Sequence, residues 1–399
     1  MNKNIKLKNA IIAIIITNLI TVSLVVLLPI PFFGGKRLIS KDLYDFIKRY
    51  DKLLKVENLI KNNYVDKKTI DENKLIEGAI NGMVDSIGDP YTVYLDKQQF
   101  EDLLTQTRGS YGGVGIVVGE KEGKLTVIAP IEDSPAEKAG IKAGDIILKV
   151  DGKEISAKEL EKAVSMMRGK EGTKVILTIF REGKGVKDYE LTRSIIVLKT
   201  VKSQVLKGDI GYIRITSFDE NTADEFEKAF EKLQKQNIKG LVLDLRDNPG
   251  GLLDTSVAIA DMILPQGTIV YTIDTNGKKD VWKSDPQNIN MPLVVLVNEG
   301  SASASEILSG AIRDFKAGTL IGTKTFGKGL VQNIIDLKDG TGLKVTIARY
   351  YTPSGECIQG KGIMPDIVYD LPKELKDKQL PIDEDPQIKK AIEVLMSKI

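Results

Sequence analysis

Between residues 208 and 350, short apolar segments alternate with amphipathic segments of helical period, and this alternation is what most restricts the possible folds. The runs at 240–245 and 292–297 are almost wholly apolar and too short for a helix, which is typical of strands buried on both faces of a parallel sheet. Further strands are predicted at 211–215 and 319–322, and helices at 221–236, 252–264 and 303–315. The sequence therefore predicts an α/β domain.

Residues 97–186 form a second predicted domain, which is small and β-rich. A helix is expected near 157–168 and a strand at 174–181, and a glycine-rich run from Gly112 to Val118 opens the domain. The segment SPAEKAGIKAGDIILKVDG, which runs from Ser134 to Gly152, closely resembles the PDZ family.

A PDZ domain implies a binding site for protein C-termini. Such domains add the peptide as a strand to a sheet edge and hold its carboxylate with backbone N–H groups. The resemblance implies that these N–H groups belong to Gly113, Val114 and Gly115, and that Val164 and Met167 line the side-chain pocket. The alternative is that the glycines only form a turn.

The N-terminal segment carries no charged residue from Asn9 to Gly35. A run of this length crosses the ~30 Å hydrocarbon core as a helix. Lysines precede the run, so the positive-inside rule places the tail in the cytoplasm and the rest of the chain outside. We expect an uncleaved single-pass membrane anchor at 9–33. The alternatives are secretion after signal-peptide cleavage and a buried soluble helix.

Amphipathic patterns predict two helices, at 39–63 and 72–86, before the turn signal Gly88-Asp89-Pro90. These helices are too small for a core of their own. They therefore either form the contact of a homodimer or pack on the next domain. The predicted organisation is a tail at 1–8, an anchor at 9–33, a helical region at 34–96, the PDZ domain at 97–186, the α/β core at 187–371 and a helical tail at 372–399.

The composition excludes several classes of site. The chain has no histidine, so it cannot hold a Ser-His-Asp or Cys-His catalytic site, an HExxH zinc site or a His-ligated haem. Its one cysteine, Cys357, excludes an internal disulfide, a four-cysteine zinc site and an iron–sulfur cluster held by this chain alone. The net charge of +2 gives no general attraction to nucleic acid, and none is expected as a partner.

Three segments hold the residues that can do chemistry: a strand leading to a glycine turn at 244–251, a strand leading to a helix at 297–306, and a glycine-rich segment at 322–332. A hydrolase without histidine needs another base, and a lysine can serve when burial lowers its pKa. A serine at a helix N-terminus benefits from the helix dipole, and a glycine turn supplies oxyanion donors. The segments therefore fit a Ser–Lys hydrolase.

The glycine-rich segment also partly matches a phosphate-binding loop. Gly322 and the Gly327-Lys328 pair have the spacing of that motif, but Gly329 follows where the motif needs Ser or Thr for Mg²⁺. No nucleotide is expected to bind.

Taken together, the three segments, the PDZ pattern and the closing runs at 350–355 and 362–367 resemble the C-terminal processing peptidases, the tail-specific serine proteases of the S41 type. The resemblance covers nearly everything after the anchor and implies a crotonase-like α/β protease core that needs no metal or cofactor. Many members have a basic residue and a serine after TPSG, whereas this chain has Glu356 and Cys357, a departure that affects only a surface loop.

The resemblance also implies a role for each candidate catalytic residue. Ser303, the middle serine of SASASE, is the nucleophile, and Lys328, 25 residues later, is its base. Gln332 orients the lysine. The other readings are that any of the three serines, Ser301, Ser303 or Ser305, only caps the helix, that Lys328 is a solvated surface charge and that Gln332 is an ordinary strand residue.

In the same family the oxyanion hole uses the N–H group that follows the serine, here Ala304, and one from the glycine turn, here Gly250 or Gly251. In some members a PDZ arginine approaches the catalytic glutamine when a substrate tail is bound, and Arg168 is the candidate for this gate. Arg246 either binds substrate or anchors the glycine turn.

The function expected from these features is that of a serine endopeptidase that recognises protein C-termini through its PDZ domain and cuts extracytoplasmic proteins. Two alternatives come from other classes. One is a membrane-anchored PDZ scaffold with an inactive protease fold, which would bind tails without cleaving them. The other is a crotonase-like acyl transferase, which the PDZ domain and the SASASE and FGKG segments disfavour.

Overall fold

The computed structural model describes residues 17, 40–375 and 380–399. The membrane anchor predicted at 9–33 therefore lies, apart from residue 17, outside the described residues. Within the described part of the chain, no helix combines the length and the apolar character needed to cross a bilayer. The chain divides into two compact units, residues 1–80 and 81–399.

The first unit contains the predicted N-terminal helices. Helix α2 (Lys41–Asn63) is followed by the 3₁₀ turn η1 (Lys67–Thr69) and by α3 (Glu72–Asp85), which extends into the second unit. Ion pairs one turn apart, Lys55 with Asp51 and Lys61 with Glu57, support α2. Large apolar side chains on α2 remain exposed: Tyr44, Ile47, Leu53, Leu54, Val56 and Leu59.

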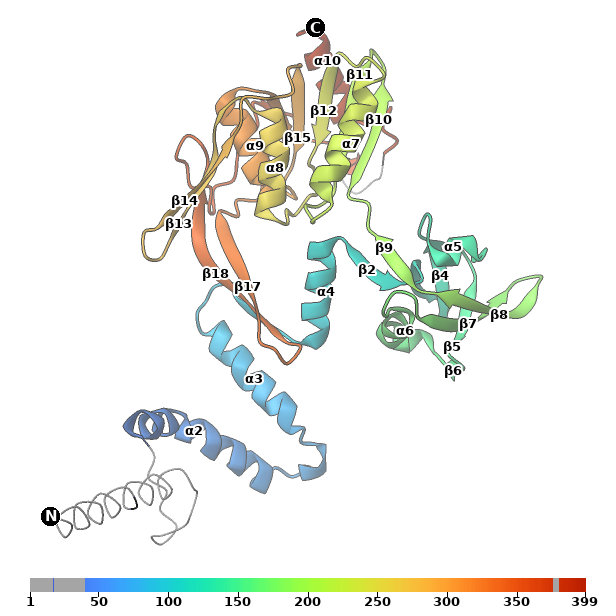
Figure 1. Cartoon of the computed structure of the whole chain (residues 1–399), viewed down its shortest axis with the longest axis vertical. Coiled ribbons are helices and arrows are strands. Elements are labelled where there is room, and N and C mark those ends of the chain that lie inside the picture. Colours follow the sequence, from blue (N-terminus) through green and yellow to red (C-terminus); the bar gives the residue numbers. More distant parts are fainter. Residues whose placement is uncertain (1–16, 18–39, 376–379) are drawn as a thin grey trace, which may run out of the picture. The chain divides into compact units, whose positions relative to one another are not determined.

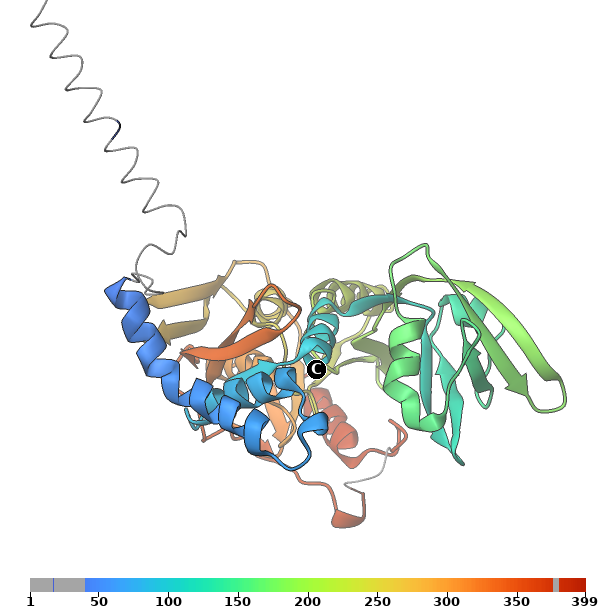
Figure 2. The ribbon, with the colours of Figure 1, turned by 90° about the horizontal axis from the view of Figure 1, so that it is seen from below.

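The β-rich domain is an antiparallel sheet of order β3-β4-β5-β7-β8, with β6 paired to β5. Its helix α6 (Leu160–Met167) contacts β3 and β5, and in Figure 2 this green helix lies alongside the strands. Strand β3 stands at the sheet edge. The elements are β3 (Ile116–Lys121), β4 (Lys124–Pro130), α5 (Pro135–Lys138), β5 (Ile146–Val150), β6 (Lys153–Glu154), η2 (Ala157–Glu159), β7 (Lys174–Arg181) and β8 (Gly185–Thr192).

Helix α4 (Lys97–Arg108), which was not predicted, occupies the start of the range predicted for this domain, 97–186, and precedes its sheet. Asp96 and Gln99 form a capping box at its start, and Gly109 ends it with a φ of 62°. Space also requires the glycine, because a Cβ there would lie 2.0 Å from Asp219 Oδ2. The next strand, β2 (Ser110–Gly113), pairs with β9 (Ser194–Val197).

The α/β domain is a six-stranded sheet of order β10-β11-β12-β15-β16-β19, parallel from β11 onward (Figure 1). Strands β12 and β15 are buried along their whole length, as their apolar sequences predict. The strands are β10 (Val201–Leu206), β11 (Ile210–Ile215), β12 (Gly240–Asp244), β15 (Leu293–Val297), β16 (Thr319–Gly322) and β19 (Ile367–Val368).

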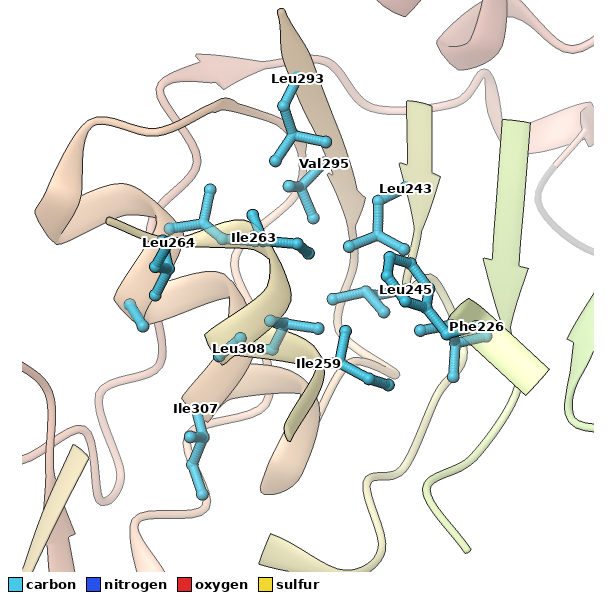
Figure 3. Close-up of a cluster of buried hydrophobic side chains, with 14 of the residues drawn as sticks. Phe226, Leu243, Leu245, Ile259, Ile263, Leu264, Leu293, Val295, Ile307 and Leu308 are labelled. Atoms are coloured by element: carbon cyan, nitrogen blue, oxygen red, sulfur yellow. The ribbon is translucent and has the colours of Figure 1, made fainter. Parts of the chain in front are cut away.

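Helices cover both faces of this sheet. The larger core joins α7 (Thr222–Gln234), α8 (Leu253–Ile263) and α9 (Ala304–Phe315) to one face, and Figure 3 shows Leu243 and Val295 of the sheet facing Ile259 and Leu308 of the helices. Each such fully buried side chain contributes roughly 1.5–3 kcal/mol to the free energy of unfolding. The C-terminal helix α10 (Pro386–Met396) packs on the other face.

A second, antiparallel sheet of order β1-β18-β13-β14, with β17 paired to β18, adjoins the α/β core. It was not predicted, and it carries the segment after Lys328. Its strands are β1 (Val93–Leu95), β13 (Gly267–Asp274), β14 (Lys279–Ser284), β17 (Leu330–Asp336) and β18 (Gly342–Tyr351).

Candidate active site

The three serines of the SASASE segment have different surroundings. Ser301 and Ser305 are fully buried, and their hydroxyls donate to Leu245 O at 2.8 Å and to Asn248 O at 2.9 Å. Ser303 is half-buried and occupies the N-cap position of α9. Its φ of 55° is unusual for a residue with a side chain, so the surrounding bonds hold a strained conformation. Only Ser303 of the three therefore has a side chain open to the adjoining cavity.

The glycine turn packs directly against this serine. A Cβ on Gly250 would lie 2.8 Å from Ser303 Cβ, and one on Gly251 would lie 2.0 Å from Phe218 O, so neither position has room for a side chain. Gly250 N donates to Asn248 Oδ1 at 2.9 Å. Among the described residues, no acceptor is found for the N–H groups of Gly251 and Ala304. These two N–H groups remain free for a ligand.

The buried carboxylate of Glu306 joins the serine segment to the lysine segment. Its Oε2 accepts from Ser303 N and Lys328 N, both at 2.9 Å. Its Oε1 accepts from Thr325 Oγ1 at 2.6 Å and Gly327 N at 2.8 Å. Sequence analysis missed this residue. Its position three residues after the helix N-cap, where a glutamate can close a capping box, was the available signal.

The ammonium group of Lys328 lies over an aromatic ring, with its Nζ 4.8 Å from the centroid of Tyr91. Within the described part of the chain, Lys328 Nζ forms no hydrogen bond, including none to Ser303 Oγ. Burial lowers the pKa of Lys328 below 10.5, and repulsion by Lys344 lowers it further, against the attraction of Asp89 and Glu306. The lysine is therefore easier to deprotonate than a solvated one.

Gln332 lies on β17 and opposite Thr346 of β18. Its Nε2 donates to Thr346 Oγ1 at 3.3 Å, so the amide bonds to the neighbouring strand.

One cavity of about 690 Å³ gathers the predicted catalytic residues. Ser303, Ala304 and the two glycines line one side of it, and Lys328 and Gln332 are also part of its wall. The wall also includes residues of α4 and of the linker between β9 and β10: Leu103, Gln106, Thr107, Leu198 and Thr200.

The predicted carboxylate-binding residues lie elsewhere, at the end of β2 and in the link from β2 to β3. Gly113, Val114 and Gly115 do not line the cavity, and no acceptor is found among the described residues for the N–H groups of Val114 and Gly115. Edge strand β3 and helix α6 follow in the same domain, an arrangement suited to strand addition. Met167 is packed into the domain core.

Arg168 does not reach the cavity either. Its Nη1 is 3.0 Å from Asp102 Oδ1 on α4, and its guanidinium carbon is 5.0 Å from the centroid of the Tyr111 ring. No bond joins it to Gln332 among the described contacts.

The side chain of Arg246, next to the glycine turn, bonds within the protein. It is buried, donates twice to Asp244, and its Nη1 donates to Asp385 Oδ2 at 2.8 Å and Gln387 Oε1 at 2.7 Å. This network joins the end of β12 to the start of α10. Burial would raise the pKa of Asp244, but the Arg246 guanidinium holds it below its usual value.

Family models match three parts of the chain: peptidase family S41 at residues 209–369, a PDZ domain at 126–181, and the N-terminal domain of the activating protease CtpB at 37–99. The carboxy-terminal processing protease CtpA of Bacillus subtilis (strain 168) is 41% identical over 326 residues, which are 81% of this chain and 70% of that protein. The carboxy-terminal-processing protease of Bartonella bacilliformis is 47% identical over 313 residues, or 76% and 71% of the two chains.

A solved structure from Bacteroides fragilis NCTC 9343, described as a candidate S41 protease, has the same fold at 19% identity. Its TM-score is 0.51, and the match covers 86% of this chain and 97% of that one.

Proposed function

Because the chain belongs to the S41 family of carboxy-terminal processing serine proteases, we propose that it cleaves extracytoplasmic proteins. In this proposal Ser303 is the nucleophile, Lys328 is the base and the PDZ domain binds the C-termini of substrates. The observation that carries the proposal is the single cavity that Ser303, with its strained backbone, shares with a half-buried lysine. The metal-free chemistry of a Ser–Lys pair accounts for a hydrolase without histidine.

In the proposed reaction, neutral Lys328 takes the proton of the Ser303 hydroxyl as Oγ forms a bond to the peptide carbonyl carbon. The resulting oxyanion is held by the N–H groups of Ala304 and Gly251, because Gly250 N–H is already donated to Asn248. The C–N bond then breaks, and the leaving amine receives the proton from Lys328. A water molecule then attacks the acyl carbon and gives a proton to Lys328, and Lys328 passes that proton to Ser303 Oγ as the ester C–O bond breaks.

Before this reaction, Lys328 Nζ has to move from the Tyr91 ring toward Ser303 Oγ, with Gln332 fixing its final position. Only the neutral amine accepts a proton. We therefore expect kcat/KM to rise with pH through the pKa of Lys328, which burial places below 10.5. A kcat/KM that is constant from about pH 6 to 10 contradicts the role of the lysine.

The test is cleavage of an unfolded protein with an apolar C-terminus by the full chain in detergent. Ser303→Ala and Lys328→Ala are each expected to lower kcat/KM by roughly 10³-fold or more. Ser397→Ala and Lys338→Ala, on the C-terminal helix and on the β17–β18 turn, are the matched controls and retain activity. Cleavage that survives Ser303→Ala overturns the proposal, and tail binding without any cleavage supports a scaffold.

We also propose that the chain is anchored by residues 9–33 with its protease outside the membrane, and that it forms a homodimer through α2 and α3. The exposed apolar side chains of α2 support the dimer, since they would be covered there. Leu54→Glu is expected to halve the molar mass measured in detergent, whereas Lys55→Glu leaves it unchanged. Protease accessibility of the intact cell surface tests the orientation.

Arg168 is the proposed gate. In the described structure its partner is Asp102, so it must leave that carboxylate to approach Gln332 when a tail binds to the PDZ domain.

A further inference from the structure

The turn from Asp89 to Thr92 lies against Lys328, a residue of the cavity wall, and the catalytic scheme gives it no role. It connects α3 to β1, and Asp89 closes it by accepting from Tyr91 N at 3.1 Å and from Thr92 Oγ1 at 2.6 Å. Strand β1 then pairs with β18 in a register that places Val93 opposite Lys344. The turn lies inside the match to the CtpB N-terminal domain and outside the matches to the S41 and PDZ models.

This turn touches the lysine. The Tyr91 ring lies 4.8 Å from Lys328 Nζ, within the range in which a ring attracts a cation. The carboxylate of Asp89 adds a negative charge that attracts the same ammonium group. The charges that act on Lys328 from the other elements are Lys344 on β18, which repels it, and Glu306 on α9, which attracts it.

The same turn also reaches the glutamine. Thr346 N donates to Thr92 Oγ1 at 3.1 Å, and Thr346 Oγ1 accepts from Gln332 Nε2 at 3.3 Å. Thr92 Oγ1 in turn donates to Asp89 Oδ2 at 2.6 Å. Hydrogen bonds made by Thr346 and Thr92 therefore link Gln332 to the carboxylate that attracts Lys328.

We infer that the Asp89–Thr92 turn is a further part of the active site. Asp89 and Tyr91 are its positioning residues, and they hold the ammonium group of Lys328 over the Tyr91 ring. This inference rests on the proposed function. It assigns a role in the reaction to a segment N-terminal to both the PDZ domain and the protease core.

The charge state of Lys328 can be measured without proteolysis. The full chain in detergent is treated with an amine-reactive acylating reagent across a pH series, and mass spectrometry of the peptide that contains Lys328 gives the pH of half-maximal modification rate. Asp89→Asn removes the attracting charge, so this midpoint is expected to fall by roughly half a unit. Tyr91→Leu removes the ring and lowers it by a similar amount, about half a unit, whereas Tyr91→Phe keeps the ring and the wild-type midpoint.

The matched control is Asp339→Asn. Asp339 closes the β17–β18 turn by accepting from Thr341 N and Oγ1, much as Asp89 accepts from its own turn, but it is not among the charges that act on Lys328. In Asp339→Asn, the pH of half-maximal modification of Lys328 is expected to stay at the wild-type value. Unchanged midpoints in both Asp89→Asn and Tyr91→Leu, or an equal fall in Asp339→Asn, overturn the inference.

The activity assay separates this inference from the proposed function. In Ser303-dependent cleavage, the acidic limb of kcat/KM against pH is expected to move to lower pH by the same half unit in Asp89→Asn. If cleavage survives Ser303→Ala, the proposed function fails, and the labelling midpoints still decide whether the turn controls the lysine.

Discussion

The proposed nucleophile and the proposed base come from two regions that are built differently. Ser303 stands between a fully buried parallel strand and a buried helix, and its neighbours Ser301 and Ser305 are bonded to the strand and turn beside it. Lys328 precedes β17 of a more exposed antiparallel sheet, and its ammonium rests on a ring from a distant turn. The core thus fixes the serine in place, while the lysine keeps a side chain that can move and a charge that its neighbours adjust.

The largest effect is expected where the two regions are joined. Glu306→Ala leaves four donors without an acceptor, in Ser303, Thr325, Gly327 and Lys328, so we expect a kcat/KM loss of roughly 100-fold or more and a free energy of unfolding lower by roughly 3–5 kcal/mol. Steady-state kinetics and urea unfolding measure the two losses.

Glu306→Gln sharpens this test. Each carboxylate oxygen of Glu306 accepts two hydrogen bonds. In glutamine one of these oxygens becomes an NH₂ group, which cannot accept from the two donors that face it, so we expect kcat/KM and the free energy of unfolding to stay nearly as low as in Glu306→Ala. Glu299→Gln, at an exposed glutamate that accepts from Thr323, is the control with near-normal kinetics. Full activity in Glu306→Gln would show that the two regions keep their positions independently.

The second effect concerns only the region around Ser303. Arg246→Met removes the cation that bonds to the buried Asp244 and Asp385 and leaves Asp244 only Arg214 at 4.0 Å, so we expect the free energy of unfolding to fall by about 3 kcal/mol. The pH of half-modification of Lys328 is expected to stay unchanged, because Arg246 is not among the charges that act on it. Chemical denaturation measures the first quantity, and a shifted midpoint would contradict the separation of the two regions.

The third effect concerns only the region around Lys328. Lys344 repels Lys328 and helps to lower its pKa, so Lys344→Gln is expected to raise that pKa and move the acidic limb of kcat/KM to higher pH. At pH values below the pKa of Lys328, kcat/KM of Lys344→Gln is expected to be roughly two- to threefold lower than that of the wild type. This shift of the acidic limb is opposite in direction to the shift expected for Asp89→Asn. Measuring kcat/KM against pH for both variants compares the two shifts directly. Shifts of the same sign would refute the electrostatic account.

The smallest effect is expected at the PDZ side. Asp102→Asn releases Arg168 from its carboxylate, and we expect cleavage of a substrate without a PDZ-binding tail to rise by about twofold. Glu101→Gln, on the neighbouring position of α4, serves as the control. Unchanged rates in Asp102→Asn would indicate that this ion pair does not restrain the gate.

Most elements of the α/β domain follow from the sequence, because apolar strands and helical periodicity are local patterns. Strand β7 begins and ends at the predicted residues, and the helix predicted at 303–315 begins one residue later. Helix α4 and the antiparallel sheet were not predicted. Their sequences lack the long run of apolar residues that marks a buried strand or helix, because strands β17 and β18 are largely half-exposed in the folded protein.

The sequence by itself indicated the family and the α/β and β-rich domains, and it predicted Ser303 and Lys328 as the catalytic pair, since those features depend on residue type and spacing within short segments. Tertiary structure decided which serine faces the cavity, which glycine N–H is free and which groups surround the lysine. These depend on contacts between remote segments. Thr92 and Thr346 bond across a separation of 254 residues, and only the pairing of β1 with β18 brings them together.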